Sequence, residues 1–393
     1  MPDAARFGEY RRNREGIRVF HVRPIARGLD LDLTADLVRA LDRASLAIGK
    51  LVGSTHLLPN PDHFIYMYLR LEALLSSRIE GTQASLMDLL QYEQDWVDRR
   101  RKDDLVQVSN HLALLRNLSH RSRARPLTVQ EVKDGHRRLV RGARGGAGSG
   151  RFRGVQNWIG SGGPIEAATF VPPSPGEVPA AMADLVRFIR GERQLPPLLV
   201  AAVAHAQFET IHPFVDGNGR MGRYLLHFIL WQRRVVERPL LYLSHYFRAR
   251  QTEYYGRLQA TRDEGDLEGW CRFLLDAAAT VGEEALARSQ RVMECRRAYE
   301  EKVRSRLGRR SGAALRALMH LYEHPIADVR AIAAWTKLSD SSANELADSL
   351  EQAEVLTELT GQKRNRRYAL AEYMDLFSVL EREPASAKPP SRR

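Results

Sequence analysis

The sequence predicts a mainly α protein, in which a helical bundle with a small β-hairpin is followed by a C-terminal winged-helix domain. Two observations carry this prediction. Apolar residues recur every three or four positions along most of the chain, which is the spacing of an amphipathic helix. After residue 312 the pattern becomes helix, helix, turn, helix and then two short strands, which is the order of elements in a winged helix.

The expected helices have recognisable start and stop signals. Ser85 with Asp88, and Thr128 with Glu131, have the spacing of capping boxes, and Gly81 suits the position just after a helix end. The other expected helices cover about residues 33–52, 61–80, 106–118, 177–190, 196–211, 220–234, 245–261, 267–280 and 283–307 in the bundle, and 313–322, 326–335 and 341–353 beyond it.

The strand signals are few and short. Residues 155–159 and 168–171 lie on either side of a loop that begins Gly-Ser-Gly-Gly-Pro, so they predict a hairpin. Two more strands are expected at 355–359 and 367–371, joined by a basic turn. The chain then divides into an N-terminal helical region (1–120), a core (121–290), a helical linker (291–312), a winged helix (313–380) and a disordered tail (381–393).

Composition limits the classes of function. The chain has 393 residues, and its 60 Lys and Arg against 48 Asp and Glu give a net charge of +12, which favours polyanions such as nucleic acid, nucleotide phosphates or an acidic protein face. The two cysteines, Cys271 and Cys295, form no metal-binding pattern, which favours a reducing compartment. No apolar run approaches the about 20 residues of a membrane span, and residues 1–27 show no signal peptide. We therefore expect a cytoplasmic protein with no membrane partner.

Residues 212–223, with the sequence HPFVDGNGRMGR, combine features of an anion site. Gly217 and Gly219 allow positive φ and a close approach of the backbone to a ligand. The following amides lead into the N-terminus of a helix, where the free N–H groups and the dipole favour an anion. Arg220 and Arg223 are three residues apart and share one side of that helix, so two guanidinium groups can meet a polyphosphate.

Two other side chains of the same segment add chemistry. Asp216 offers a hard oxygen ligand, which suits Mg²⁺ better than zinc. His212 can accept a proton near neutral pH. A histidine before a glycine-rich turn is more often structural, but a base, a metal-binding carboxylate and a phosphate cradle on one loop together describe a transferase that acts on a nucleotide.

The segment resembles the signature of the Fic (Fido) family, His-x-Phe-x-Asp/Glu-Gly-Asn-Gly-Arg-x-x-Arg, at every fixed position. Proteins of this family typically transfer AMP from ATP to a Ser, Thr or Tyr hydroxyl of a protein, and the resemblance, which covers about residues 33–287, implies a Fic-type bundle with this catalytic core. It implies that His212 deprotonates the target hydroxyl, that Asp216 holds Mg²⁺ between the α- and β-phosphates, and that Arg223 meets the γ-phosphate. Phe214 would anchor the loop. The phosphates would be cradled by Gly217, Asn218, Gly219 and Arg220.

A second match lies upstream, at the end of the helix expected over about 61–81. Ser76, Glu80 and Gly81 fit the family's inhibitory pattern, Ser/Thr-x-x-x-Glu-Gly/Asn. Glu80 falls in the last turn, where the helix dipole disfavours a carboxylate, so a cationic partner is expected. The resemblance implies that this partner is Arg223, and that the pairing keeps Arg223 from the γ-phosphate.

The resemblance also implies roles for the hairpin and for two tyrosines. The hairpin is similar to the family's target-docking flap, where an exposed edge receives the target segment by strand addition. The flap residues are expected to be Gly160, Ser161, Gly162, Gly163 and Phe170. Tyr254 and Tyr255 resemble a stretch near the adenine, although aromatic residues of a helix core would have the same spacing.

Other functions stay open at this point. The basic residues of the expected wing (Lys363, Arg364, Arg366 and Arg367) favour a DNA-binding regulator in which the nucleotide site is a sensor. Removal of AMP and use of another nucleotide donor are also compatible with the motif. A metal-dependent hydrolase built on His205, His212 and Asp216 is weaker, because their spacing follows no zinc-site pattern. The target protein is not identified, and the chain itself is a candidate. A homodimer is a further open alternative.

Overall fold

The computed structural model describes residues 6–55, 61–96, 102–143, 149–160 and 163–382, and it confirms a mainly α fold. The helices of the bundle are α1 (Ala35–Thr55), α2 (Pro61–Ile79), α3 (Leu86–Glu93), α4 (Lys102–His120), α5 (Val129–Leu139), α6 (Val178–Gly191), α7 (Pro197–Ile211), α8 (Asn218–Gln232), α9 (Leu243–Ala249), α10 (Gln251–Asp263) and α11 (Leu267–Arg306). Both predicted capping boxes are present, at the starts of α3 and α5. Every described helix is too short or too polar to cross a bilayer.

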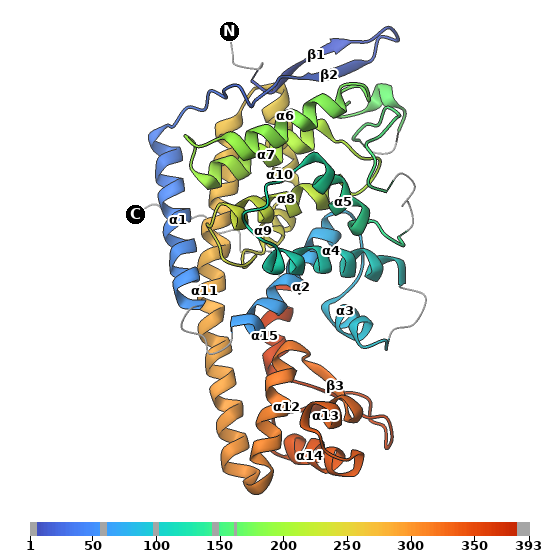
Figure 1. Cartoon of the computed structure of the whole chain (residues 1–393), viewed down its shortest axis with the longest axis vertical. Helices are drawn as coiled ribbons and strands as arrows, with labels where there is room; N and C mark the ends of the chain where they lie inside the picture. The colour runs from blue at the N-terminus through green and yellow to red at the C-terminus, as the bar shows by residue number, and fades with distance from the viewer. Residues whose placement is uncertain (1–5, 56–60, 97–101, 144–148, 161–162, 383–393) are drawn as a thin grey trace.

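The centre of the bundle is the pair α7 and α8. Every residue of α7 from Leu198 to Ile211 is buried, because the helix is largely apolar and is surrounded by α6, α8, α10 and α11. Helix α2 packs against α4 and α9, and its last turn contacts the first turns of α8. Figure 1 shows α1 lying along the long helix α11 at one side of the bundle.

Two helix boundaries differ from the prediction. The helix expected over 245–261 is divided into α9 and α10, with Arg250 between them in a non-helical conformation. The two helices expected over 267–280 and 283–307 are one helix of 40 residues, α11. Gly282 does not interrupt it, since a Cβ at this position would lie 3.2 Å from the Cβ of Ala47 in α1. Close packing of the two helices therefore outweighs the weak helix propensity of glycine.

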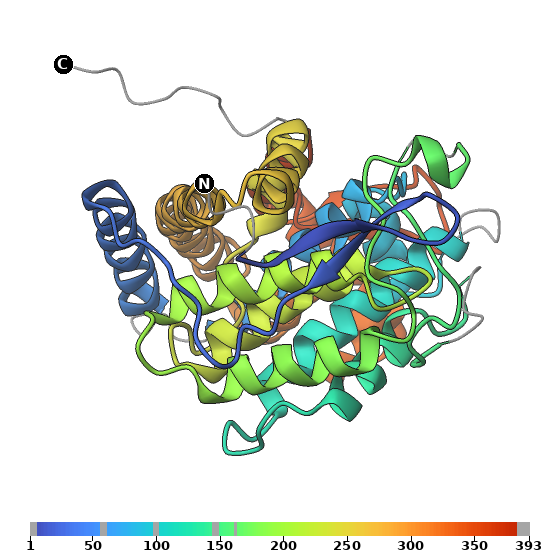
Figure 2. The ribbon, with the colours of Figure 1, turned by 90° about the horizontal axis from the view of Figure 1, so that it is seen from above.

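The predicted hairpin is wrong as a pair of strands. Residues 155–159 and 168–171 share a single antiparallel bridge, between Ile159 and Phe170. An N-terminal hairpin that the sequence analysis missed is formed by β1 (Gly8–Arg12) and β2 (Arg18–Val22). It lies over the bundle in Figure 2, and the N–H of Phe20 donates to the carbonyl of Val171 at 3.0 Å.

The C-terminal part has the predicted order of elements, with two additions. Its elements are α12 (Ser311–Glu323), β3 (Ile326–Asp328), α13 (Val329–Thr336), α14 (Asp340–Gln352), β4 (Thr357–Glu358), β5 (Arg367–Ala369) and α15 (Ala371–Arg382). Strand β3 was not predicted, and it completes an antiparallel sheet of order β3-β5-β4. The linker expected at 291–312 is the second half of α11, a short 3-10 turn (Gly308–Arg310) and the start of α12.

Helix α15 corrects the prediction of disorder from residue 381. Glu381 and Arg382 are its last two residues, and 383–393 lie outside the described residues. The helix returns to the bundle and packs against α2 and α11, as Figure 1 shows. The rings of Tyr68 and Phe377 meet edge to face with centroids 5.4 Å apart. A segment that begins in the C-terminal part is therefore built into the core around α2.

Candidate functional site

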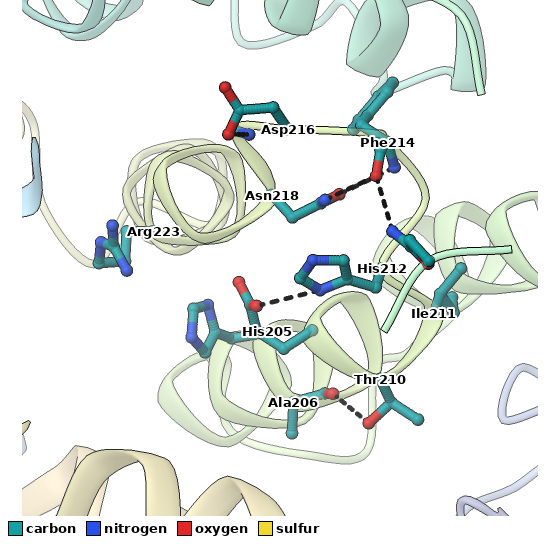
Figure 3. A network of polar contacts seen from close by, with 12 residues as sticks. His205, Ala206, Thr210, Ile211, His212, Phe214, Asp216, Asn218 and Arg223 are labelled. Carbon is teal, nitrogen blue, oxygen red and sulfur yellow. Dashed lines mark hydrogen bonds and ion pairs between the residues drawn. The ribbon is translucent and has the colours of Figure 1, made fainter. Parts of the chain in front are cut away.

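The loop between α7 and α8 is held by its own side chains. His212 ends α7 with φ 47°, and Gly217, with φ 77°, precedes α8. The side chain of Asn218 closes the loop, because its Oδ1 accepts from the N–H of Phe214 at 2.9 Å and its Nδ2 donates to the carbonyl of Phe214 at 2.8 Å. The buried ring of Phe214 stacks on His136 at 3.7 Å. Figure 3 shows Asn218 bonded to Phe214 beside His212.

A cavity of about 690 Å³ joins the loop to the end of α2. It brings together Glu80 from beyond α2, His212 from the end of α7, and Gly219 and Arg223 from the first turns of α8. Its other lining residues are Trp158, Ile159, Gly160, Thr169, Glu209, Tyr254, Tyr255, Gly256, Leu258, Gln259 and Arg262. The sequence motifs at 76–81 and 212–223 thus meet at one site.

Arg223 is bound by the upstream motif. Its Nη2 donates to Oε1 of Glu80 at 2.6 Å and to the carbonyl of Ser76 at 2.9 Å, and its Nε donates to Oγ of Ser76 at 2.7 Å. Burial opposes the charge of Arg223, but the neighbouring Glu80 carboxylate outweighs burial and raises the pKa of the guanidinium. Gly81 follows with φ 96°, which ends the helix. The ion pair expected between Glu80 and Arg223 is present.

Gly219 leaves the space that the Glu80 carboxylate occupies. A Cβ at this position would lie 2.1 Å from Oε1 of Glu80, so only glycine lets the carboxylate approach the first turn of α8. The expected positive φ is found at Gly217 and not at Gly219, which is helical. The need for glycine at residue 219 is therefore one of space.

His212 faces the cavity with its ring largely covered. Its side chain is 19% exposed, and Nδ1 lies 3.9 Å from Oε2 of Glu209 in α7. Burial, with Arg262 and Arg153 nearby, lowers the pKa of His212 to about 4. The ring is therefore neutral near pH 7, the form that can accept a proton.

Asp216 and Arg220 are not among the described residues that line the cavity. The Asp216 side chain is 56% exposed, its Oδ1 accepts from the N–H of Gly217 at 2.6 Å, and its Oδ2 is 3.9 Å from Arg220. Arg220 is buried and donates to Gln107 of α4. An exposed carboxylate oxygen next to the N-terminus of α8 fits Mg²⁺, which takes one or two carboxylates together with phosphate oxygens. Within the described part of the chain no group of three His, Cys, Asp or Glu residues could hold a metal by itself.

The expected flap and adenine residues are only partly at the cavity. Gly160 lines it and Phe170 is buried behind it, while the carbonyl of Gly163 accepts from Nε1 of Trp158 at 3.1 Å. Ser161 and Gly162 lie outside the described residues. Trp158 and Gly160 are exposed residues of the cavity lining, so this segment forms part of the open side of the site.

The two tyrosines have different positions. Tyr254 is 1% exposed, and its hydroxyl is 2.8 Å from Nε2 of His205, so it belongs to the aromatic core under the cavity. Its expected contact with a base is therefore not favoured. Tyr255 is 45% exposed and lines the cavity, where a base could stack on it.

Sequence analysis missed two charged residues of the cavity. Glu209 is a carboxylate within the apolar run of α7, one turn before His212, and that position was a signal that could have been read. Arg262 lies seven residues after Tyr255, two turns along α10, and its guanidinium lies 4.0 Å from the centroid of the Phe170 ring. Burial lowers the pKa of Arg262 to about 10.

The fold and the cavity define a helical protein in which two buried arginines, Arg223 and Arg262, line a cavity at the start of a central buried helix, next to a neutral histidine. Comparison with protein families agrees with this class: the Fic/DOC family model matches residues 126–230, and the Fic/DOC family N-terminal model matches residues 38–118. The chain therefore carries Fic/DOC family domains over these two stretches. Residues 275–373 match a domain of unknown function, DUF2019.

Similar proteins are known as sequences and as structures. The chain is 31% identical over 152 residues to the protein adenylyltransferase Fic of Drosophila melanogaster, and 30% identical over 152 residues to that of Drosophila grimshawi. Each match covers 38% of this chain and 28% of the relative. The crystal structure of a Fic family protein from Desulfovibrio desulfuricans has a TM-score of 0.58 and 21% identity, over 86% of this chain and 97% of that one. This likeness confirms the fold.

Proposed function

We propose that the protein is a protein adenylyltransferase, which transfers AMP from ATP to a Ser, Thr or Tyr hydroxyl of a target protein or of itself. The observation that carries the proposal is the cavity in which His212 and Arg223 meet beside the first turn of α8. The similarity to the Drosophila adenylyltransferases, although it spans 28% of their length, supports the same reaction.

The chemistry follows from what this chain's residues can do. The lowered pKa of His212 keeps its imidazole neutral and able to take the proton of the target hydroxyl. The hydroxyl oxygen then bonds to the α-phosphorus of ATP, and pyrophosphate leaves with the electrons of the broken P–O bond. The protein contributes mainly alignment and charge neutralisation to this step.

The triphosphate would be held at the N-terminus of α8. The free N–H groups of the first turn point toward that end, and Arg220 and Arg223 lie on the same helix. Asp216 would hold Mg²⁺, which neutralises phosphate charge when bound. Tyr255 offers a face for stacking of the base.

Glu80 would restrain the reaction. Its carboxylate lies against Gly219, in the space above the first turn of α8 where an anion is favoured, and it already pairs with Arg223. A phosphate at the same place would meet a like charge and would lack this arginine. We infer that ATP binds productively after Glu80 moves aside.

The test is AMP transfer from α-labelled ATP with Mg²⁺, using the full chain and a lysate as acceptors. We expect little transfer by the wild type, clear labelling by Glu80→Gly, and none by Glu80→Gly with His212→Ala. Mass spectrometry of the labelled proteins distinguishes AMP from another nucleotide. Complete absence of transfer by Glu80→Gly with any nucleoside triphosphate would reject the proposal, whereas loss of AMP from a labelled protein would point to the reverse reaction.

The alternative functions receive less support. In a winged helix the third helix would read DNA, but the helix in that place, α14, is acidic: its charged residues are Asp340, Glu345, Asp348 and Glu351. Arg366 pairs with Asp348 at 2.6 Å, so part of the basic turn is already neutralised. A zinc hydrolase using His205 is disfavoured too, since this ring is buried and bonded to Tyr254.

A further inference from the structure

A buried carboxylate faces the imidazole of His212 from the last turn of α7. Glu209 lies one turn before His212, and its Oε2 is 3.9 Å from Nδ1 of that ring. The other oxygen of Glu209, Oε1, and Nδ1 of His212 both have no hydrogen-bond partner among the described residues. Buried polar atoms are almost always paired, so two unpaired ones in neighbouring groups require an explanation.

Packing confines the carboxylate to the side of the cavity. Oε1 lies against Gly222 of α8, where a Cβ would be 2.3 Å from it, so any larger residue would push the carboxylate away. Glu209 and His212 both line the cavity. The pair is therefore close to the place where a reacting hydroxyl would lie.

Glu209 ionises within the physiological pH range. Burial raises its pKa to about 7; the charge of Arg223 opposes this shift and that of Glu80 adds to it. The titratable and charged groups around Glu209 and His212 come from each neighbouring element. They are Arg223 of α8, Glu80 beyond α2, Arg262 and Tyr254 of α10, His205 of α7, and Arg153, which lies between α5 and α6.

We propose that Glu209 is a positioning residue for His212: ionised Glu209 holds the imidazole through Nδ1 and stabilises the imidazolium formed when Nε2 takes the proton of the target hydroxyl. This inference rests on the proposed transferase function. Glu209 itself takes no proton. The target O–H bond breaks, the proton moves to Nε2, and the new bond to the α-phosphorus replaces the bond to pyrophosphate. The carboxylate then acts as the aspartate does in a Ser-His-Asp triad.

A purely structural role predicts a different outcome. A carboxylate that only braced the end of α7 would affect stability when replaced, but it would not link the rate to its own ionisation. Glu209→Gln keeps the shape and removes the charge, so it separates the two roles. Asp184→Asn is the matched control, because Asp184 is a buried carboxylate of α6 that accepts from the N–H groups of Ile25 and Ala26, away from the cavity.

The first experiment measures transfer from α-labelled ATP between pH 5.5 and 8.5, with all variants in the Glu80→Gly background. We expect the parent rate to fall as the pH drops through the pKa of Glu209, at or below about 7, since the variant lacks the Glu80 charge that raises this pKa. Glu209→Gln should be slower by about tenfold or more at pH 8, with the same Kd for ATP and with no such fall. Asp184→Asn should keep the parent profile. A Glu209→Gln variant with the parent's rate and profile would overturn the proposal.

The second experiment does not need the transfer activity. ¹⁵N NMR of the histidine-labelled full chain follows Nδ1 of His212, assigned by loss of its signal in His212→Gln. We expect this signal to shift with pH as Glu209 ionises, and to stay constant over the same range in Glu209→Gln. Equal behaviour of both proteins contradicts the role of Glu209 even where transfer is observed. If the signal shifts with pH in the parent and stays constant in Glu209→Gln, but no transfer is observed, only the proposed transferase function is contradicted.

Discussion

Neutralising Glu80 should make ATP bind more tightly, by an amount that the Arg223 contact sets. The hydrogen bond from Arg223 to Glu80 is 2.6 Å long, and the side chains are 1% and 34% exposed. Hydrogen bonds to charged groups contribute roughly 1.5–3 kcal/mol, and the partial exposure of Glu80 places this one near the lower end, at about 2 kcal/mol. Since 1.4 kcal/mol is a factor of ten in affinity, Glu80→Gly should lower the Kd for ATP roughly 30-fold.

The assay is calorimetric titration of ATP and Mg²⁺ in a His212→Ala background, so that no transfer consumes the nucleotide. Glu80→Gln should give part of the gain, because an amide still accepts from Arg223 without a full charge. Glu345→Gln is the control, since Glu345 forms an exposed ion pair with Arg310 in the C-terminal part. In the absence of ATP, Glu80→Gly should also melt at a lower temperature, because Arg223 is left buried with a weaker set of partners. Equal Kd values for the wild type and Glu80→Gly would refute the competition.

Three further predictions concern the loop, the buried acid and α15. Asn218→Ala removes both hydrogen bonds to Phe214, so we expect a loss of about 2 kcal/mol in the free energy of unfolding by urea titration and a mobile loop with little transfer. The folded-state pKa of Glu209 is raised from 4.5 to about 7, so ionisation opposes folding: its neutral form stabilises the protein below about pH 4.5, and this contribution of roughly 3 kcal/mol is lost as the pH rises through about 7. Glu209→Gln should therefore unfold with a weaker pH dependence over that range, and an unchanged dependence would contradict the burial argument. Glu381 pairs with Arg78 two residues before Glu80, so Glu381→Gln should loosen the end of α2 and raise transfer by the otherwise wild-type chain, measured beside Glu372→Gln as the control.

The loop between α7 and α8 and its proposed role could be predicted because the residues concerned lie in one contiguous string. Twelve neighbouring residues carry the base, the glycines, the carboxylate and both arginines, and the helix that follows is set by local preference. The pairing of Glu80 with Arg223 joins residues 143 apart in the sequence. This pairing was predicted from the family resemblance, together with the expectation that a carboxylate at a helix C-terminus needs a cationic partner.

The parts that were missed depend on contacts between distant segments. Helix α11 continues through Gly282 because α1 packs on it. This contact between the two helices cannot be recognised in the sequence of either helix alone. Strands β1 and β2 are rich in arginine, and their pairing is completed by Val171, far along the chain. Glu209 was overlooked because the role of a single acidic residue in an apolar helix depends on its neighbour in the folded structure, which here is His212.

Arg223 connects the two helix ends that make the site. In the last turn of α2 the N–H of Glu80 donates to Ser77 at 3.1 Å, which leaves the carbonyl of Ser76 to accept from Arg223 at 2.9 Å. The guanidinium thus caps the negative end of α2 while its backbone belongs to the first turns of α8. Ser76 supplies two of its three hydrogen bonds and Glu80 the third. Under the proposed function, a phosphate would replace Glu80 without releasing the arginine, because Ser76 would keep it in place: the serine would orient the cation, and the glutamate would be the partner that is exchanged.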